Sequence, residues 1–186
     1  MRIISGKFKG INLYGPKDKK IRPLKDMVRE SIFNFLAHSN KISFKLEGSN
    51  ILDLYSGTGS FGLECLSRRA NKIIFIEKEK GAIKILEKNI KKINQDKSTK
   101  IINKDTLSFI EKNINNLKFN LIFCDPPFND KNIEILIGLI SQKKLLEKNG
   151  IIIVHRNKNI IDKIPDYFNV IEERTYGISK IIFGTL

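Results

Sequence analysis

The sequence has little cysteine and no long hydrophobic run, and each absence excludes a class of protein. Its two cysteines, Cys65 and Cys124, fall in predicted buried elements rather than in a spaced framework, which indicates reduced core residues and no disulfide scaffold. No segment approaches the roughly 20 consecutive apolar residues of a membrane span, so we expect no membrane association. The opening residues 1–7 lack the apolar stretch of a signal peptide, and the reduced cysteines lead us to expect a cytoplasmic protein.

Acidic residues are also scarce relative to basic ones. The 34 lysines and arginines outnumber the 20 aspartates and glutamates, for a net charge of +14, which is typical of a protein with a nucleic-acid partner. Lysine supplies 27 of these cations beside abundant isoleucine and asparagine, as in an AT-biased coding sequence, so charge alone does not identify the partner. The cations expected to contact a polyanion lie near the amino terminus: Arg2, Lys7, Lys9, Arg22 and Arg29.

The chain shows no repeat, low-complexity tract or long linker, and its 186 residues suffice for one core. Residues 1–24 are basic and punctuated by glycine and proline, which predicts a small β-hairpin extension ahead of a main domain at 25–186. A helical pattern begins at Asp26, which we expect to cap that helix.

From residue 51 onward, apolar strands alternate with amphipathic helices. Predicted strands cover 51–55, 73–76, 101–102, 119–124 and 151–154. Predicted helices cover 61–69, 83–93, 106–113 and 132–140. Continuously apolar strands separated by helices favour a parallel sheet covered on both faces, and the closing segments 169–174 and 178–183 leave room only for an antiparallel hairpin.

A glycine-rich turn, residues 53–62, joins the first of these strands to its helix. Gly57, Gly59 and Gly62 match the G-x-G-x-x-G pattern of dinucleotide enzymes, a signal that is weak alone. Asp53 at the strand end would repel a pyrophosphate but suits a bound ammonium or hydroxyl group.

Two further acids follow the next two strands. Glu77 ends the second strand, where an acid can accept from both ribose hydroxyls, and Asp105 follows the third, where an acid can meet an adenine amino group. Each acid alone is equally well explained as a turn former or helix cap. Together with Asp53 at three adjacent strand ends, they favour an adenosine with a cationic amino-acid tail, and S-adenosylmethionine is such a molecule.

The segment Asp125-Pro126-Pro127-Phe128 follows the strand at 119–124. The prolines fix the backbone and lack an N–H, so the Asp125 carboxylate and the Pro126 carbonyl are held as acceptors beside an aromatic face. This combination suits a flat base whose exocyclic amino group donates two hydrogen bonds while Phe128 stacks on the ring.

These motifs resemble the class I S-adenosylmethionine-dependent methyltransferases, and closely resemble those that methylate guanine N2 in 16S ribosomal RNA. The similarity runs through residues 1–10, 22–34, 53–70, 125–128 and 174–177. It implies an α/β, Rossmann-like sheet, mostly parallel with an antiparallel C-terminal hairpin, and catalysis by Asp125 to Phe128. The cofactor contacts that it implies are Asp53, Tyr55, Ser56, Gly57, Thr58, Gly59, Glu77, Lys78, Asp105 and Thr106.

The chain departs from the family pattern at three positions. Leu24 stands where the family usually has threonine, Met27 where it has arginine, and Phe128 where tyrosine is more frequent. The loss of arginine at position 27 removes a cation from that helix, whereas Phe128 keeps the stacking face. The resemblance also implies that ribosomal RNA or the small ribosomal subunit is the partner, and we expect a monomer.

Other functions remain as alternatives. The acid-Pro-Pro-aromatic motif also occurs in enzymes that act on adenine N6 and cytosine N4, but a DNA enzyme would need a separate recognition domain. An NAD(P)-dependent oxidoreductase would leave residues 125–128 without a role, and an idle RNA-binding assembly factor would not need the four acids. His38 and His155 lack a neighbouring nucleophile or metal-ligand spacing, so we expect structural roles for both and no metal site.

Overall fold

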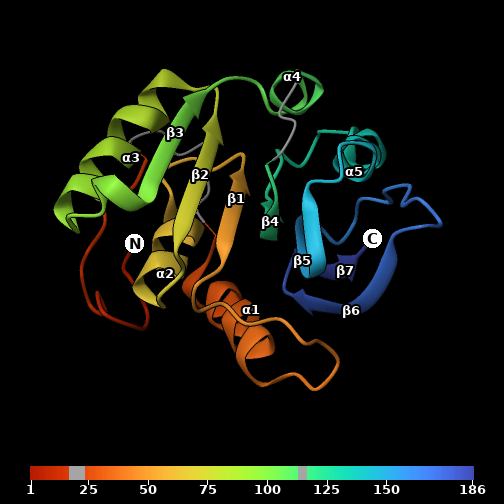
Figure 1. The fold of residues 1–186 in the computed structure, drawn as a ribbon, viewed down its shortest axis with the longest axis horizontal. Coiled ribbons are helices and arrows are strands. Elements are labelled where there is room, and N and C mark those ends of the chain that lie inside the picture. Colours follow the sequence, from red (N-terminus) through yellow and green to blue (C-terminus); the bar gives the residue numbers. More distant parts are fainter. Residues whose placement is uncertain (17–23, 113–116) are drawn as a thin grey trace.

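The computed structural model describes residues 1–16, 24–112 and 117–186, and its centre is a seven-stranded sheet (Figure 1). The strands are β1 (Asn50–Leu54), β2 (Lys72–Glu77), β3 (Thr99–Asn103), β4 (Phe119–Cys124), β5 (Leu146–Asn157), β6 (Asn169–Tyr176) and β7 (Ser179–Thr185). Their order is β3-β2-β1-β4-β5-β7-β6. Strands β1 to β5 pair in parallel, whereas β7 pairs antiparallel with β5 and β6. The expected α/β fold is confirmed.

Helices cover both faces of the sheet, as the alternation of its side chains requires. One face carries α1 (Asp26–His38), α2 (Ser60–Ser67) and α3 (Lys80–Lys92), and the other carries α4 (Thr106–Glu111) and α5 (Ile133–Gln142) (Figure 1). A 3-10 turn, η1 (Asp96–Ser98), precedes β3. Ile51 of β1 belongs to the core under α1 to α3, and its neighbour Leu52 to the core under α4 and α5. The strands are therefore buried on both sides, which explains their unbroken apolar sequences.

Several boundaries differ from the sequence prediction. Strand β1 ends at Leu54, and Tyr55, expected within it, turns into the left-handed region with φ 58°. Lys25 is the N-cap residue of α1, so the prediction that Asp26 caps the helix was wrong. Helix α4 ends at Glu111, and position 113 of the predicted helix lies outside the described residues.

In the predicted extension 1–24, residues 17–23 lie outside the described residues, and the described part is a hairpin only in outline. Its two arms run antiparallel through a single bridge between Arg2 and Asn12, rather than through a regular ladder. Ile3 and Leu13 are buried in the same core as α1, α2 and α3. The segment is thus fastened to the main sheet by apolar burial.

Candidate active site

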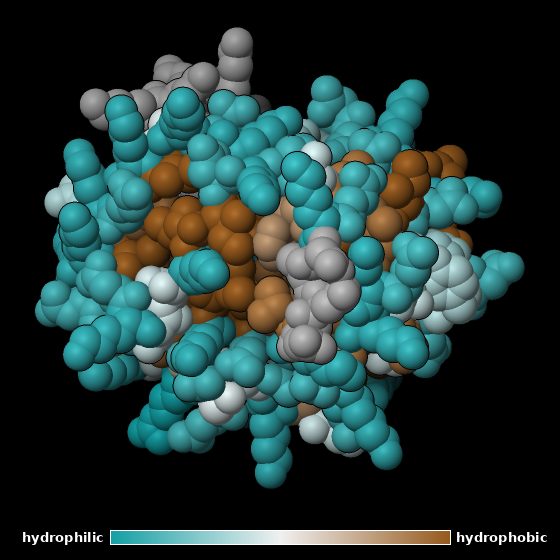
Figure 2. Space-filling model, turned by 45° about the horizontal axis from the view of Figure 1, so that its top comes forward, coloured by the Kyte–Doolittle hydropathy of each residue, from teal (hydrophilic) through white to brown (hydrophobic). Residues whose placement is uncertain are grey.

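A cavity of about 480 Å³ lies at the carboxyl ends of the parallel strands. Figure 2 shows a hollowed hydrophobic area surrounded by hydrophilic side chains on the side of the molecule toward which these strand ends point. The volume is typical of a small-molecule site. Residues 125–128 line it together with expected cofactor contacts from three other segments: Tyr55, Ser56, Gly57, Thr58, Glu77, Lys78, Asp105 and Thr106.

The loop between β1 and α2 forms one wall of this cavity. Tyr55, Gly57 and Gly59 all have positive φ (58°, 54° and 84°), so the chain turns sharply from strand to helix. The Ser56 amide donates to the Ile76 carbonyl (3.0 Å), which holds the loop against β2. Buried Asn89 of α3 donates to the Thr58 carbonyl (3.0 Å), a contact that the sequence analysis missed although this amide interrupts the apolar face of the helix.

Glu77 fixes the neighbouring wall. Its Oε2 accepts from the Gly57 amide at 2.7 Å, and its Oε1 accepts from the Lys78 and Glu79 amides, both at 2.8 Å. The residue is 8% exposed and lines the cavity. A carboxylate held by three amides is fixed in place and still offers lone pairs to hydroxyl donors.

Asp105 and Tyr55 complete the cofactor side. Asp105 caps α4 by accepting from the Ser108 amide (3.2 Å), yet it remains exposed at the cavity. Burial, together with the negative charge of Asp130, raises the pKa of the Tyr55 phenol. Tyr55 therefore stays protonated and keeps its hydroxyl as a donor.

Asp53 does not reach the cavity, which corrects the expectation that it contacts the cofactor. Successive side chains alternate across a strand, so Asp53 points to the α2 face, where Oδ2 accepts from the Gly62 amide at 3.0 Å. It is 1% exposed, and burial raises its pKa well above the ordinary value. Gly59, another expected contact, serves as the N-cap of α2 and does not line the cavity either.

The acid-Pro-Pro-aromatic loop follows β4 and forms the opposite wall. The Asp125 amide donates to the Leu54 carbonyl (3.4 Å), so the loop starts beside the glycine-rich loop. The Asp125 side chain is 25% exposed and Phe128 is half-buried. Cys124, just before the acid, is fully buried, and burial raises the pKa of its thiol, which agrees with the expected core role.

The sequence analysis expected a structural role for His155 and did not place this residue at the cavity. Its ring lines the cavity, and its Nδ1 lies 2.7 Å from Oδ1 of Asp125. A usable signal was present in the sequence, because His155 directly follows the predicted strand 151–154 and so belongs to the same sheet edge as the acids. His38 is exposed at the end of α1, away from these contacts.

The next residue of β5, Arg156, holds the main chain of the same loop. Its guanidinium donates to the carbonyls of Pro127 (3.1 Å) and Asp130 (2.6 Å) and forms a two-point ion pair with Asp162 (2.7 and 2.8 Å). Arg156 is completely buried. No local sequence pattern indicated this clamp, because its partners are separated along the chain.

Comparison with known proteins agrees with this geometry. The model of the family described as conserved hypothetical protein 95 matches residues 1–185. The chain belongs to this family. It is 32% identical over 179 residues to ribosomal RNA small subunit methyltransferase D of Haemophilus influenzae, which covers 96% of this chain and 90% of the relative. The protein of the same name from Escherichia coli K12 is 29% identical over 178 residues, or 95% of this chain and 85% of that one.

A solved structure supports the same assignment. The yhhF protein of Escherichia coli superposes with a TM-score of 0.83 and 27% identity, and covers 99% of this chain and 96% of its own. More distantly, the fold is shared with SMU.776, solved in complex with SAH, at 14% identity and a TM-score of 0.70 over 90% of this chain and 50% of that chain. The family resemblance and the fold inferred from the sequence are thereby confirmed.

In this family member, the amino-terminal cations divide into exposed and buried ones. Lys7 and Lys9 are exposed, and the Arg2 side chain is 68% exposed. Arg29 is completely buried, so the expectation that it contacts RNA was wrong. Arg22 lies outside the described residues.

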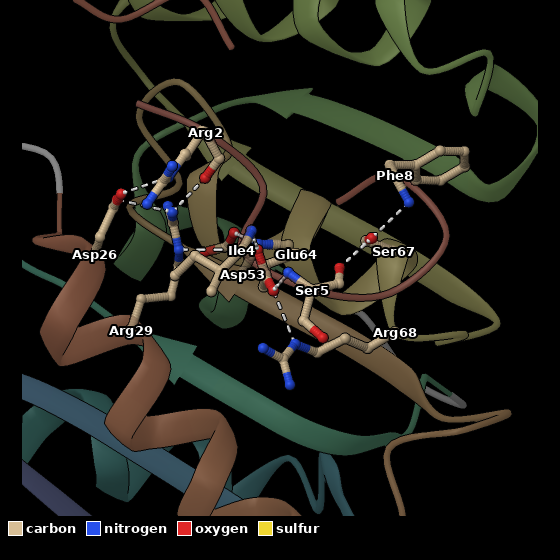
Figure 3. A network of polar contacts seen from close by, with 11 residues as sticks. Arg2, Ile4, Ser5, Phe8, Asp26, Arg29, Asp53, Glu64, Ser67 and Arg68 are labelled. Carbon is tan, nitrogen blue, oxygen red and sulfur yellow. Dashed lines mark hydrogen bonds and ion pairs between the residues drawn. The ribbon is translucent and has the colours of Figure 1, made fainter. Parts of the chain in front are cut away.

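Buried polar contacts explain the position of Arg29. Its guanidinium donates to the Arg2 carbonyl (2.5 Å) and to Asp26 (3.0 Å), and its Nε lies 4.0 Å from Glu64 of α2 (Figure 3). Buried Glu64 also accepts from the amides of Ile4 (2.7 Å) and Ser5 (3.0 Å). Arg29 and Glu64 therefore join the amino-terminal segment to α1 and α2.

Among the described residues, no helix has the length and apolar character needed to cross a membrane.

Proposed function

We propose that this protein transfers a methyl group from S-adenosylmethionine to the exocyclic N2 of a guanine in 16S ribosomal RNA. The observation that carries this proposal is the meeting of Asp125, Pro126 and Phe128 with the glycine-rich loop and Glu77 around one cavity. Similarity to proteins named ribosomal RNA small subunit methyltransferase D supports ribosomal RNA as the substrate. Such a substrate also places the enzyme with the ribosomes, in the cytoplasm.

The residues around the cavity fit the proposed methyl donor. Glu77 presents a fixed carboxylate for ribose hydroxyls, Asp105 an exposed acceptor for an adenine amino group, and Ile76 and Ala82 an apolar surface for the adenine ring. When bound, S-adenosylmethionine supplies a sulfonium-activated methyl group. Residues 55–58, 78 and 106 would hold the remainder of the molecule.

Asp125 and Pro126 provide the acceptors for the target amine. The lone pair of an exocyclic amine is delocalised into the ring, so the amine is a poor nucleophile. Acceptance of its hydrogens by the Asp125 carboxylate and the Pro126 carbonyl favours a more tetrahedral nitrogen with an available lone pair. The amine loses one proton during the reaction, and the carboxylate of Asp125 is placed to take it.

Phe128 provides the face on which the base stacks, and it excludes water from the reacting nitrogen. Most of the acceleration would come from holding the base and the fixed acceptors in position. A target base must be unstacked to enter the cavity. We propose that Arg2, Lys7 and Lys9 contact the RNA backbone, and that the enzyme acts as a monomer.

The decisive experiment uses purified protein, methyl-labelled S-adenosylmethionine and small ribosomal subunits that lack the modification. Labelled N2-methylguanosine after nucleoside digestion would support the proposal, whereas labelled N6-methyladenosine would keep the enzyme class and overturn the base. Binding of S-adenosylmethionine without transfer to any RNA would favour the idle assembly factor.

Replacement of Asp125 tests whether its carboxylate takes part in the methyl transfer. Asp125→Ala should lower the turnover number by about 10²–10⁴-fold, the range for losing a proton-accepting group, with cofactor affinity by calorimetry nearly unchanged. Glu87→Ala, on the exposed side of α3, is the matched control and should retain full activity. Normal turnover by Asp125→Ala would contradict the role assigned to this carboxylate.

A further inference from the structure

Asp125 is held from one side by a histidine that the reaction scheme above does not use. Nδ1 of His155 lies 2.7 Å from Oδ1 of Asp125, and Nε2 lies 3.0 Å from Oγ of Ser179 on β7. His155 is 6% exposed and Ser179 is 8% exposed. Both ring nitrogens therefore have a partner, and the imidazole bridges strand β7 and the loop after β4.

These contacts determine where the imidazole protons lie. A carboxylate only accepts hydrogen bonds, so the short contact with Asp125 requires a proton on Nδ1. In a ring with one proton, Nε2 is then a bare acceptor, and the Ser179 hydroxyl donates to it. The structure thus calls for the Nδ1–H tautomer of His155.

The same contact leaves one oxygen of Asp125 available. Oδ1 is engaged by His155, whereas nothing in the described residues donates to Oδ2. The carboxylate is 25% exposed, and it lines the cavity beside Phe128. The Phe128 ring stands edge-on to the imidazole, with centroids 5.8 Å apart and planes at 76°, so His155 also contacts the proposed stacking face.

We propose that His155 is a positioning residue that locks Asp125 in one orientation, with Oδ1 bound to the imidazole and Oδ2 directed to the target amine. The inference rests on the proposed amine methylation. Strand β5 then sets the geometry of the acceptor. His155 holds the side chain of Asp125, while Arg156 holds the main chain of the loop after β4 through the Pro127 and Asp130 carbonyls.

Two substitutions separate positioning from packing. His155→Leu removes the donor, and Asp125 is then free to rotate. His155→Asn restores a donor, because the amide nitrogen of asparagine is separated from Cβ by the same bonds as Nδ1 of histidine. His38→Asn, at the exposed end of α1, is the matched control.

The kinetic expectation is a selective loss of turnover. His155→Leu should lower kcat for N2-methylguanosine formation by about 10²-fold, the scale of a misplaced reacting group, with KM for RNA and the Kd of S-adenosylmethionine within about twofold of the wild type. His155→Asn should recover at least about tenfold of that loss, and His38→Asn should match the wild type. Unchanged kcat in His155→Leu, with thermal unfolding showing the variant folded, would overturn the proposal.

A spectroscopic measurement tests the contact without any substrate. The chain contains only two histidines, so ¹⁵N spectra of the side chains are assigned by comparison with His38→Asn. At a pH where the His155 ring carries one proton, Nδ1 should be protonated and Nε2 bare, and Asp125→Ala should abolish that preference. A ring protonated on Nε2 in the wild type would overturn the inference. Wild-type protein with this tautomer but no activity on ribosomal RNA would instead overturn the proposed function.

Discussion

The carboxylate of Glu77 is joined to the amide of Gly57 by a hydrogen bond of 2.7 Å. Through this contact the end of β2 fixes the glycine-rich loop of β1, and the Ser56 amide reinforces it by donating to the Ile76 carbonyl. The cofactor side of the cavity is therefore held in place by hydrogen bonds within the protein. Groups held in this way bind a ligand more tightly because less order must be imposed on binding.

Glu77→Gln should weaken the binding of S-adenosylmethionine. The amide of glutamine offers one acceptor oxygen in place of two, so at least one of the three backbone amides loses its partner. We expect the Kd of S-adenosylmethionine, measured by calorimetry, to rise by about tenfold or more, as for the loss of a charged hydrogen bond. Glu87→Gln on the exposed face of α3 should leave the Kd unchanged. An unaltered Kd in Glu77→Gln would remove Glu77 from the cofactor site.

The buried ion pair between Arg156 and Asp162 should matter for both stability and activity. Asp162→Asn leaves the Arg156 charge buried without its counter-charge, which typically costs about 3–5 kcal/mol. Urea unfolding should show this loss, and methyl transfer should fall because the Pro127 and Asp130 carbonyls lose a fixed anchor. The exposed pair of Arg69 and Glu47 is the control, and Glu47→Gln should have little effect on either measurement.

Asp53 should give the protein a distinctive pH dependence. Burial raises its pKa well above 3.8, so above pH ~4 the folded state holds this proton more tightly than the unfolded state does. The contribution of Asp53 to the free energy of unfolding therefore falls as pH rises from the unfolded to the folded pKa. Asp53→Asn carries no such penalty, so the stability of this variant minus that of the wild type should increase in urea titrations as the pH rises above about 4. A difference that is constant with pH would contradict an elevated Asp53 pKa.

Gly62→Ala should destabilise the start of α2. A Cβ at this position would lie 2.3 Å from the Phe75 ring and 3.0 Å from Oδ2 of Asp53, and Phe75 is completely buried. Overpacking of this kind costs about 1–3 kcal/mol. Gly81→Ala in α3 is the opposite case, because nothing lies within 4 Å of its added Cβ, and it should stabilise by about 0.4–1 kcal/mol. Equal effects of the two variants in urea unfolding would show that Phe75 yields to the added methyl group.

The sequence was sufficient to predict the sheet and most of the residues that line the cavity. Unbroken apolar strands between amphipathic helices indicate a parallel sheet, and acids or glycines directly after those strands must meet at one edge. Glu77, Asp105 and Asp125 were found by this reasoning. His155 follows its strand in the same way, and it was missed because it was judged by sequence neighbours rather than by its place in the sheet.

Only the tertiary structure decided which of these groups face the ligand and which serve the core. Asp53 and Glu77 both lie near strand ends, yet Asp53, which pairs with Phe75, is buried under α2, whereas Glu77, two residues beyond Phe75 on β2, reaches the cavity. Arg29 looked like an RNA contact, but it is buried against Glu64, which lies on another helix. The sequence determines the order and type of the elements through local patterns, whereas the partner of a charged side chain depends on segments brought together by folding.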